Sequence, residues 1–161
     1  MQALVYLHTP SYGKAVMFSQ TEDNKAIALD FARAGWGTNH DWQLVWDRIM
    51  SENVIYHFNS SAAPIVGLAA NKAFNAELFQ GFPDAHQTIE DVVAEGNKVV
   101  YRTTFQGTHT GEFLGTAATG RSVQVNDFTL LHIADRKILE WWYECNLLEV
   151  LQQLGLVSSQ S

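Results

Sequence analysis

The sequence lacks the features that mark several classes of protein. It contains one cysteine, Cys145, which cannot form an intrachain disulfide. No apolar run approaches the roughly 20 residues that a helix needs to cross a bilayer. Residues 1–12 have neither the basic start nor the apolar segment of a secretion signal. We therefore expect a protein that has no membrane partner and is located in the cytoplasm.

Basic and metal-binding residues are also sparse. The chain has 10 Lys and Arg residues against 17 Asp and Glu residues, a formal net charge of −7, and no basic run. Nucleic-acid binding depends on clustered basic side chains, so we expect no nucleic-acid partner. The 6 histidines are scattered and the single cysteine offers no zinc motif, so the sequence predicts no metal site.

The composition is that of one folded domain. The 161 residues suit a single hydrophobic core, since 47% of them are apolar and 12% are aromatic. Residues 1–18 contain Pro10 and Gly13 and show no periodicity, so they are predicted to form an arm. The domain is predicted to cover residues 19–157, and residues 158–161 to form a tail.

Two kinds of periodicity divide this domain. Helical spacing of apolar residues predicts helices over residues 21–35, 42–49, 68–79 and 147–154. The first helix is expected to end at Gly35 or Gly37, and Asn39 or Asp41 to cap the second. Alternating residues predict strands over residues 54–59, 86–94, 98–109, 122–133 and 137–146. Because most helices precede most strands, the pattern indicates an α+β fold.

A series of short motifs follows in order from Phe82 to Gly155. The motifs are Phe82-Pro83-Asp84, Glu95-Gly96-Asn97-Lys98-Val99, Gly107-Thr108-His109-Thr110-Gly111-Glu112-Phe113, Thr119-Gly120-Arg121, Lys137-Ile138-Leu139-Glu140-Trp141-Trp142 and Leu151-Gln152-Gln153-Leu154-Gly155. The series resembles the SnoaL-like polyketide cyclase family of the nuclear transport factor 2-like superfamily. The resemblance extends over residues 21–155.

The resemblance implies a fold, an assembly and a reaction. The fold is a cone-shaped, bent, mixed or antiparallel sheet wrapped around N-terminal helices, a cystatin-like α+β barrel with a cavity at one end. The assembly is a homodimer that packs through the sheet. The reaction is an intramolecular aldol cyclisation, or a related isomerisation, of an enolisable small carbonyl compound such as a polyketide ester. It uses an Asp and a nearby His and no cofactor.

Two departures from the family pattern leave other functions open. Relatives often carry His-Trp where this chain has Trp141-Trp142, and an Asp where it has Asn146. If those ionisable groups are required for catalysis, the chain is instead a non-catalytic module that binds a hydrophobic small molecule. A protein-interaction domain is the third alternative, because the superfamily also includes such domains.

Asp127 is the predicted proton acceptor. It lies in a row of mostly apolar residues on one strand face: Val123, Val125, Asp127, Thr129, Leu131 and Ile133. Burial in such a row would raise the pKa of Asp127 and make it an effective base or acid near neutral pH. Alternatively, Asp127 is solvated or pairs with Arg121. An offset of two positions in the family pattern would instead place Thr129 at the acid/base position.

His109 is the predicted proton donor. It shares a strand face with Tyr101 and Phe105, which are predicted to contact the substrate together with Thr129. An imidazole can donate a hydrogen bond to a carbonyl oxygen or transfer a proton near neutral pH. The alternative is a turn histidine that binds the backbone at the rim of the pocket.

The remaining predicted pocket residues come from the first and last strands. His57 and Asn59 share a face and are predicted to line the pocket mouth. The alternative, with equal weight, is that His57 is a core histidine and that Asn59 begins the following loop. Trp141 and Tyr143 share a face and are predicted to contact the substrate, which directs Trp142 outward to a dimer surface. The helical spacing of Trp36, Trp42 and Trp46 predicts core packing.

Overall fold

Our structure of this chain is a computed structural model that describes residues 19–36, 39–59 and 63–158. The helices are α1 (Gln20–Ala34), α2 (Trp42–Ile49), α3 (Leu68–Gly81) and α4 (Leu147–Gln153). The strands are β1 (Met50–Phe58), β2 (Ile65–Val66), β3 (His86–Glu95), β4 (Lys98–Thr108), β5 (Ser122–Ala134) and β6 (Lys137–Cys145). The predicted arm and residues 159–161 of the predicted tail lie outside the described residues.

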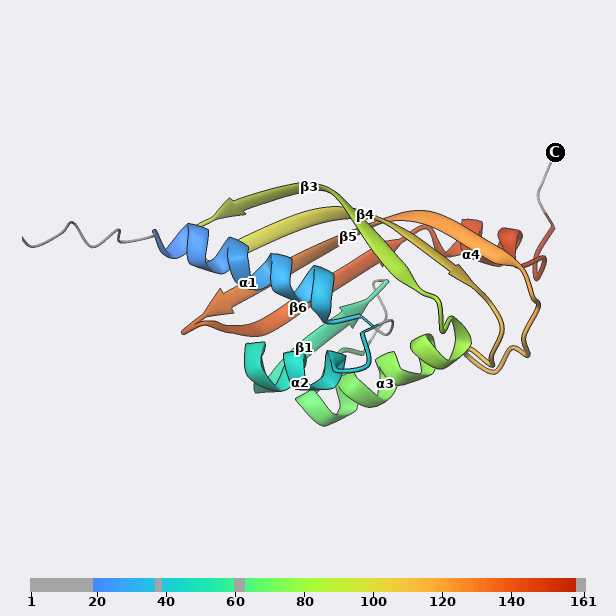
Figure 1. The fold of residues 1–161 in the computed structure, drawn as a ribbon, viewed down its shortest axis with the longest axis horizontal. Helices are drawn as coiled ribbons and strands as arrows, with labels where there is room; N and C mark the ends of the chain where they lie inside the picture. Colours follow the sequence, from blue (N-terminus) through green and yellow to red (C-terminus); the bar gives the residue numbers. More distant parts are fainter. Residues whose placement is uncertain (1–18, 37–38, 60–62, 159–161) are drawn as a thin grey trace, which may run out of the picture.

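The strands form one mixed sheet in the order β2-β1-β6-β5-β4-β3. β1 runs parallel to β6, and the other neighbours are antiparallel. The bent sheet has the expected cone-like shape, and the fold class is confirmed (Figure 1). The sheet is not closed into a complete barrel, because β2 and β3, the strands that end the order, do not pair with each other.

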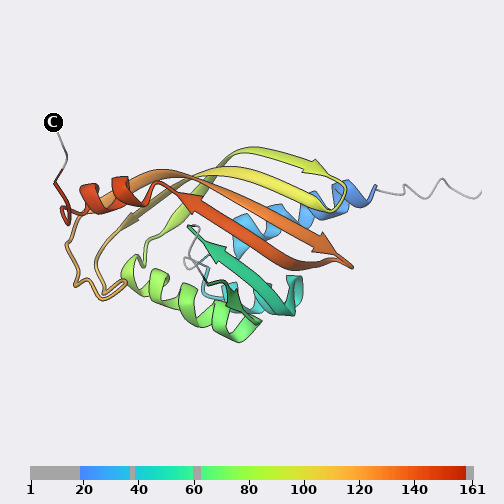
Figure 2. The same cartoon turned by 180° about the vertical axis from the view of Figure 1, so that it is seen from behind.

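The helices lie mainly on one side of this sheet. α1 packs against β3, β4 and β5, and α3 packs against β1 and β2. α4 contacts β5 at the far end of the sheet. None of the helices that the structure describes covers the opposite face of β4, β5 and β6 (Figure 2). In the described part of the chain, no helix combines the length and the apolar character that a membrane span requires.

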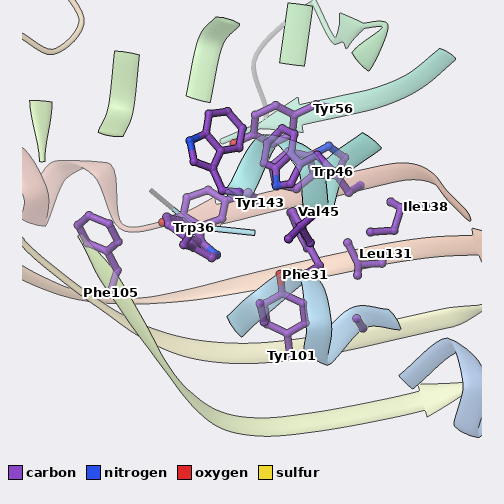
Figure 3. Packing of buried hydrophobic residues seen from close by; sticks show 14 of the residues in the cluster. Phe31, Trp36, Val45, Trp46, Tyr56, Tyr101, Phe105, Leu131, Ile138 and Tyr143 are labelled. Carbon is purple, nitrogen blue, oxygen red and sulfur yellow. The ribbon is translucent and has the colours of Figure 1, made fainter. Parts of the chain in front are cut away.

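The core is a cluster of aromatic side chains between the helices and the sheet (Figure 3). Trp36, Trp42 and Trp46 are buried in it, as their helical spacing predicted. The Trp46 indole donates a 2.9 Å hydrogen bond to the carbonyl of Gly35, which ties α2 to the end of α1. Rings from separate elements therefore fill the space beneath the sheet.

The end of α1 matches the expected cap, whereas the start of α2 lacks a side-chain capping bond from its N-cap residue. Gly35 ends α1, where its N–H donates to the carbonyl of Phe31. Asp41 precedes α2 but forms no side-chain capping bond. The Asn39 side chain instead donates a 2.6 Å hydrogen bond to the carbonyl of Ala34. Asp41 thus holds the predicted N-cap position but makes no capping bond through its side chain. Asn39 satisfies the C-terminal end of the first helix with its amide N–H, and its Oδ1 accepts a 3.2 Å hydrogen bond from the N–H of Asp41.

The two faces of β4 and β5 follow the predicted alternation. Every second residue from Val99 to His109 is buried, and so is every second residue from Val123 to Ile133. β4 and β5 pair without a register shift, with Thr103 opposite Asp127. The polar side chains in these two rows consequently lie on the side of the sheet that α1 covers.

Candidate functional site

Asp127 is a fully buried carboxylate in the middle of β5. The Thr103 hydroxyl on β4 donates to Oδ1. Gln87 on β3 donates to Oδ2 at 3.1 Å, and the Tyr143 hydroxyl on β6 donates to the same oxygen at 3.3 Å. Three other strands of the sheet, β3, β4 and β6, thus hold this carboxylate with neutral hydrogen-bond donors.

This environment changes the acidity of Asp127. Burial raises its pKa to about 6, and the hydrogen bonds from Thr103, Gln87 and Tyr143 limit the rise. The alternative of a surface carboxylate paired with Arg121 was wrong, because Asp127 is inaccessible to solvent and its hydrogen-bond partners Thr103, Gln87 and Tyr143 are uncharged. The geometry therefore gives a carboxyl group that can exchange a proton close to neutral pH.

A narrow apolar cleft lies next to this group. Its volume is about 40 Å³, close to the space that one water molecule occupies in the liquid, which is about 30 Å³. Tyr143, Val125 and Cys145 form the wall nearest Asp127. The other lining residues are Phe58, Phe74, Leu78, Phe82, Phe105, Phe113, Leu147 and Val150. Two of the predicted substrate contacts, Phe105 and Tyr143, thus lie at the cleft.

Thr129 and Tyr101 lie one step further along the sheet. They pair with each other in register, and both are buried on the same face as Asp127. Burial raises the pKa of Tyr101, so its phenol remains protonated at neutral pH. Neither residue lines the cleft.

Trp141 has a packing role. Its ring stacks on Tyr56 with 3.6 Å between centroids, and its indole N–H donates to Oδ1 of Asn71 at 3.2 Å. Asn71 is fully buried and also donates to the carbonyl of Gly67 at 2.8 Å. The structure therefore places Trp141 in the core and not at the cleft where the sequence suggested it.

His109 is buried, but the structure does not bring it to Asp127. The backbone N–H of His109 donates a hydrogen bond to the carbonyl of Arg121. Arg121 lies six positions before Asp127, and the chain between them is nearly extended. At about 3.3 Å per residue, the two side chains are separated by about 20 Å along the strand. The prediction that they act as a close pair on one substrate is therefore not supported. His109 lines a different hollow, beside α4.

His57 and Asn59 do not share a face. His57 lies on the outer face of the sheet, where its ring stacks on Trp142 and its Nε2 is 2.8 Å from a Glu140 carboxylate oxygen. Asn59 follows β1 with a positive φ of 43°, which breaks the strand alternation. Its Oδ1 accepts a 2.8 Å hydrogen bond from the N–H of Cys145. The placement of His57 at the pocket mouth was wrong, and Asn59 supports a cleft residue without lining the cleft itself.

Thr103 and Gln87 complete the Asp127 environment but were not among the predicted site residues. The sequence does contain a signal for Thr103, because strand alternation places it between Tyr101 and Phe105 on the inner face. Gln87 is harder to find, since a bulge between Ile89 and Asp91 interrupts the alternation of β3. Across the described ranges, no group of three or more His, Cys, Asp or Glu side chains is arranged to hold a metal ion.

Comparisons with known proteins identify relatives of the chain. The family model for SnoaL-like polyketide cyclase matches residues 26–154. A solved structure from Jannaschia sp. CCS1, a candidate SnoaL-like polyketide cyclase, is 32% identical with a TM-score of 0.83, and the match covers 87% of this chain and 96% of that one. AclR from Streptomyces galilaeus, a candidate hydroxylase, is 25% identical with a TM-score of 0.72 over 85% of this chain and 98% of its own.

A more distant structure has the same fold. IdmH from Streptomyces antibioticus, a candidate polyketide cyclase, is 22% identical with a TM-score of 0.70, and the match covers 82% of this chain and 98% of that one. The search of curated proteins found no match. Because the family model extends over most of the chain, from α1 to α4, the chain belongs to the SnoaL-like polyketide cyclase family.

Proposed function

We propose that the chain catalyses a cofactor-independent cyclisation or isomerisation of an enolisable carbonyl compound, with Asp127 as the acid/base. The observation that carries the proposal is a buried carboxyl group whose pKa is raised to about 6, held by neutral donors beside an apolar cleft. A general base is most effective when its pKa lies near the working pH. At neutral pH this carboxyl is mostly ionised and can accept a proton.

In the proposed reaction, Asp127 first accepts a proton from the substrate and later returns it. Asp127 removes a proton from the carbon next to the substrate carbonyl, which forms an enolate. Once protonated, the carboxyl accepts hydrogen bonds less strongly, so the Tyr143 hydroxyl can donate to the enolate oxygen instead. The enolate carbon attacks a second carbonyl, a carbon–carbon bond forms, and Asp127 returns its proton to the new alkoxide.

A substrate must enlarge the cleft before this chemistry can occur. A volume of about 40 Å³ does not hold a carbocycle. Five of the lining residues are Phe, whose rings can rotate without breaking a hydrogen bond: Phe58, Phe74, Phe82, Phe105 and Phe113. The proposed substrate is therefore a small apolar or polyketide-like molecule that displaces these rings and excludes water from Asp127.

The test is deuterium exchange at the carbon next to the carbonyl of 1-indanone, a small apolar ketone. General base catalysis typically contributes about 10²- to 10⁴-fold, so Asp127→Asn should lower the enzyme-dependent rate at least 10²-fold. The wild-type rate should rise with pH around 6 as Asp127 ionises. Asp91→Asn is the matched control, because Asp91 is exposed and pairs with Arg102 on the outer face.

Equal rates for wild type and Asp127→Asn would remove Asp127 from the mechanism. Circular dichroism of both variants separates a loss of chemistry from a loss of fold. If the wild type binds the ketone and exchanges no deuterium, the acid/base proposal fails and the binding function described next is favoured.

A non-catalytic binding module is the second candidate. It is favoured by the structural roles of Trp141 and Asn146, which stand where relatives often carry ionisable groups. Trp141 is part of the core, and Asn146 caps α4 by accepting a 3.2 Å hydrogen bond from the N–H of Glu149. Native mass spectrometry with aromatic ketones would support this candidate if it detected bound ligand without product.

We also propose that the chain forms a homodimer through the outer face of the sheet. An outward-facing row crosses five strands through cross-strand neighbours: Val93, Val100, Leu130, Trp142 and His57. Phe128, beside this row, is 52% exposed. Phe128→Lys should convert dimer to monomer in sedimentation experiments, whereas Leu44→Lys on α2 should not. A monomeric wild type would contradict the proposal.

A further inference from the structure

A second apolar hollow lies between α4 and the loop that follows β4. Its volume is about 250 Å³, much larger than that of the cleft beside Asp127. The lining residues are His109, Phe113, Leu114, Thr116, Leu147, Val150, Leu151, Leu154 and Leu156. Leu114 and Leu156 are 51% and 41% exposed, so the hollow has an apolar rim open to solvent.

His109 supplies the one ionisable group in this lining. The residue is fully buried, and its ring stacks on Phe82 with 5.0 Å between centroids. Its Nδ1 accepts a 3.3 Å hydrogen bond from the backbone N–H of Thr119. The Thr119 hydroxyl is 3.1 Å from the same nitrogen, and it accepts a hydrogen bond from the N–H of Arg121. Both contacts fix the orientation of the ring.

These hydrogen bonds determine the tautomer of His109. A backbone N–H can only donate, so Nδ1 carries no proton, and the neutral imidazole carries its proton on Nε2. Nε2 is buried and has no hydrogen-bond partner among the described residues. An N–H donor buried without an acceptor lowers stability, so a ligand oxygen that reached Nε2 would be favoured. His109 has no solvent-accessible surface, so the ligand must displace a lining side chain to reach this nitrogen.

We propose that this hollow is a binding site for a small, neutral, apolar ligand whose carbonyl oxygen accepts a hydrogen bond from His109 Nε2. Apart from His109, the lining contains only apolar side chains and Thr116, so a charged ligand would lose its hydration without gaining a counter-ion. The volume is slightly below the range of about 300–1,000 Å³ for drug-sized pockets, which favours a single-ring ketone or ester.

This site is separate from the acid/base site. The two hollows share Phe113, Leu147 and Val150 as walls, but His109 lines only the larger one. Asp127 lines neither, and it lies six strand positions from Arg121, the backbone partner of His109. A ligand bound to His109 therefore does not reach the carboxyl group of Asp127. The site adds a binding function to the proposed chemistry. An experiment can therefore refute the His109 site without refuting the Asp127 chemistry, and the reverse also holds.

Acetophenone and ethylbenzene test the proposal, because they have similar ring and chain sizes and only acetophenone has an acceptor. A net hydrogen bond of about 0.5–1.5 kcal/mol predicts that wild type binds acetophenone about 2- to 10-fold more tightly, as measured by titration in NMR. In His109→Phe, which keeps an aromatic ring against Phe82, this preference should disappear. Asp127→Asn should retain it, which separates the two sites.

Leu151→Trp should block both ligands, because an indole at this position fills the hollow. Nitrogen-15 spectra of the wild-type imidazoles provide a readout that does not depend on any variant folding. The His109 Nε2 signal should be that of a protonated nitrogen, and it should shift with acetophenone and not with ethylbenzene. Equal affinities for the two ligands, or a proton on Nδ1 in place of Nε2, would overturn the proposal.

Discussion

Replacing Asp127 with Asn should change how the stability of the protein depends on pH. In the unfolded chain an Asp has a pKa of about 3.9, whereas burial raises the pKa of Asp127 in the folded protein to about 6. The folded state therefore holds this proton more tightly than the unfolded state does. The resulting stabilisation is complete below pH 4 and is lost as the pH rises through 6.

The size of this effect follows from the pKa difference. About two pKa units at 1.36 kcal/mol each correspond to about 3 kcal/mol of unfolding free energy lost between about pH 4 and pH 7. Asn cannot ionise, so Asp127→Asn should not show this loss. Its altered hydrogen bonds with Thr103, Gln87 and Tyr143 add an offset that does not vary with pH.

Urea unfolding followed by tryptophan fluorescence, at fixed protein concentration from pH 4 to pH 8, measures this difference. Asp84→Asn is an informative comparison, because Asp84 has the opposite shift. The backbone N–H and hydroxyl of Thr108 donate to Asp84 at 2.7 Å each and lower its pKa. Its stabilisation is present at neutral pH and lost on acidification. A wild type and an Asp127→Asn variant with parallel pH profiles would refute the burial of an ionisable Asp127.

Three further substitutions test the packing around the site. Asn71→Ala should lower the unfolding free energy by about 3 kcal/mol in urea titrations, because it leaves the buried Trp141 indole N–H without an acceptor and removes the side-chain donor to the Gly67 carbonyl. Gly111→Ala would place Cβ 2.1 Å from the carbonyl oxygen of Gln80, so calorimetry should show a Tm lower by about 5–10 °C. Phe113→Ala removes a wall shared by the two hollows, and calorimetric titration should show tighter binding of 2-acetylnaphthalene relative to acetophenone. In each case, a variant with the same unfolding free energy, Tm or relative affinity as the wild type would contradict the contact on which the prediction depends.

The sequence predicted the inner face of β4 and β5 well because strand alternation is a local property. Side chains two residues apart point the same way whatever the rest of the chain does, provided that no bulge intervenes. Asp127, Thr129, Tyr101 and Phe105 therefore lie on the predicted face. The periodicity of apolar residues likewise predicted the order of the helices and strands, which the structure confirms apart from the added two-residue β2.

Features set by long-range geometry could not be predicted in the same way. Strand alternation predicts that His109 and Asp127 share the inner face, but it does not predict the distance between them. That distance depends on the register in which β4 and β5 pair. Asn59 departs from the alternation because its positive φ turns the chain directly after β1. The small volume of the cleft depends on how five Phe rings pack together from different elements.

The parallel pairing of β1 with β6 has a consequence for how the chain folds. Ile55 pairs with Glu140 and Phe58 with Tyr143, so residues far apart in sequence must meet. Until the segment of β6 has emerged from a ribosome, the two-residue β2 is the only strand of the described chain with which β1 can pair. Contacts between distant residues slow folding because closing a long loop reduces chain entropy. Docking of β1 is therefore expected to be a late step, after the hairpins formed by β3, β4, β5 and β6.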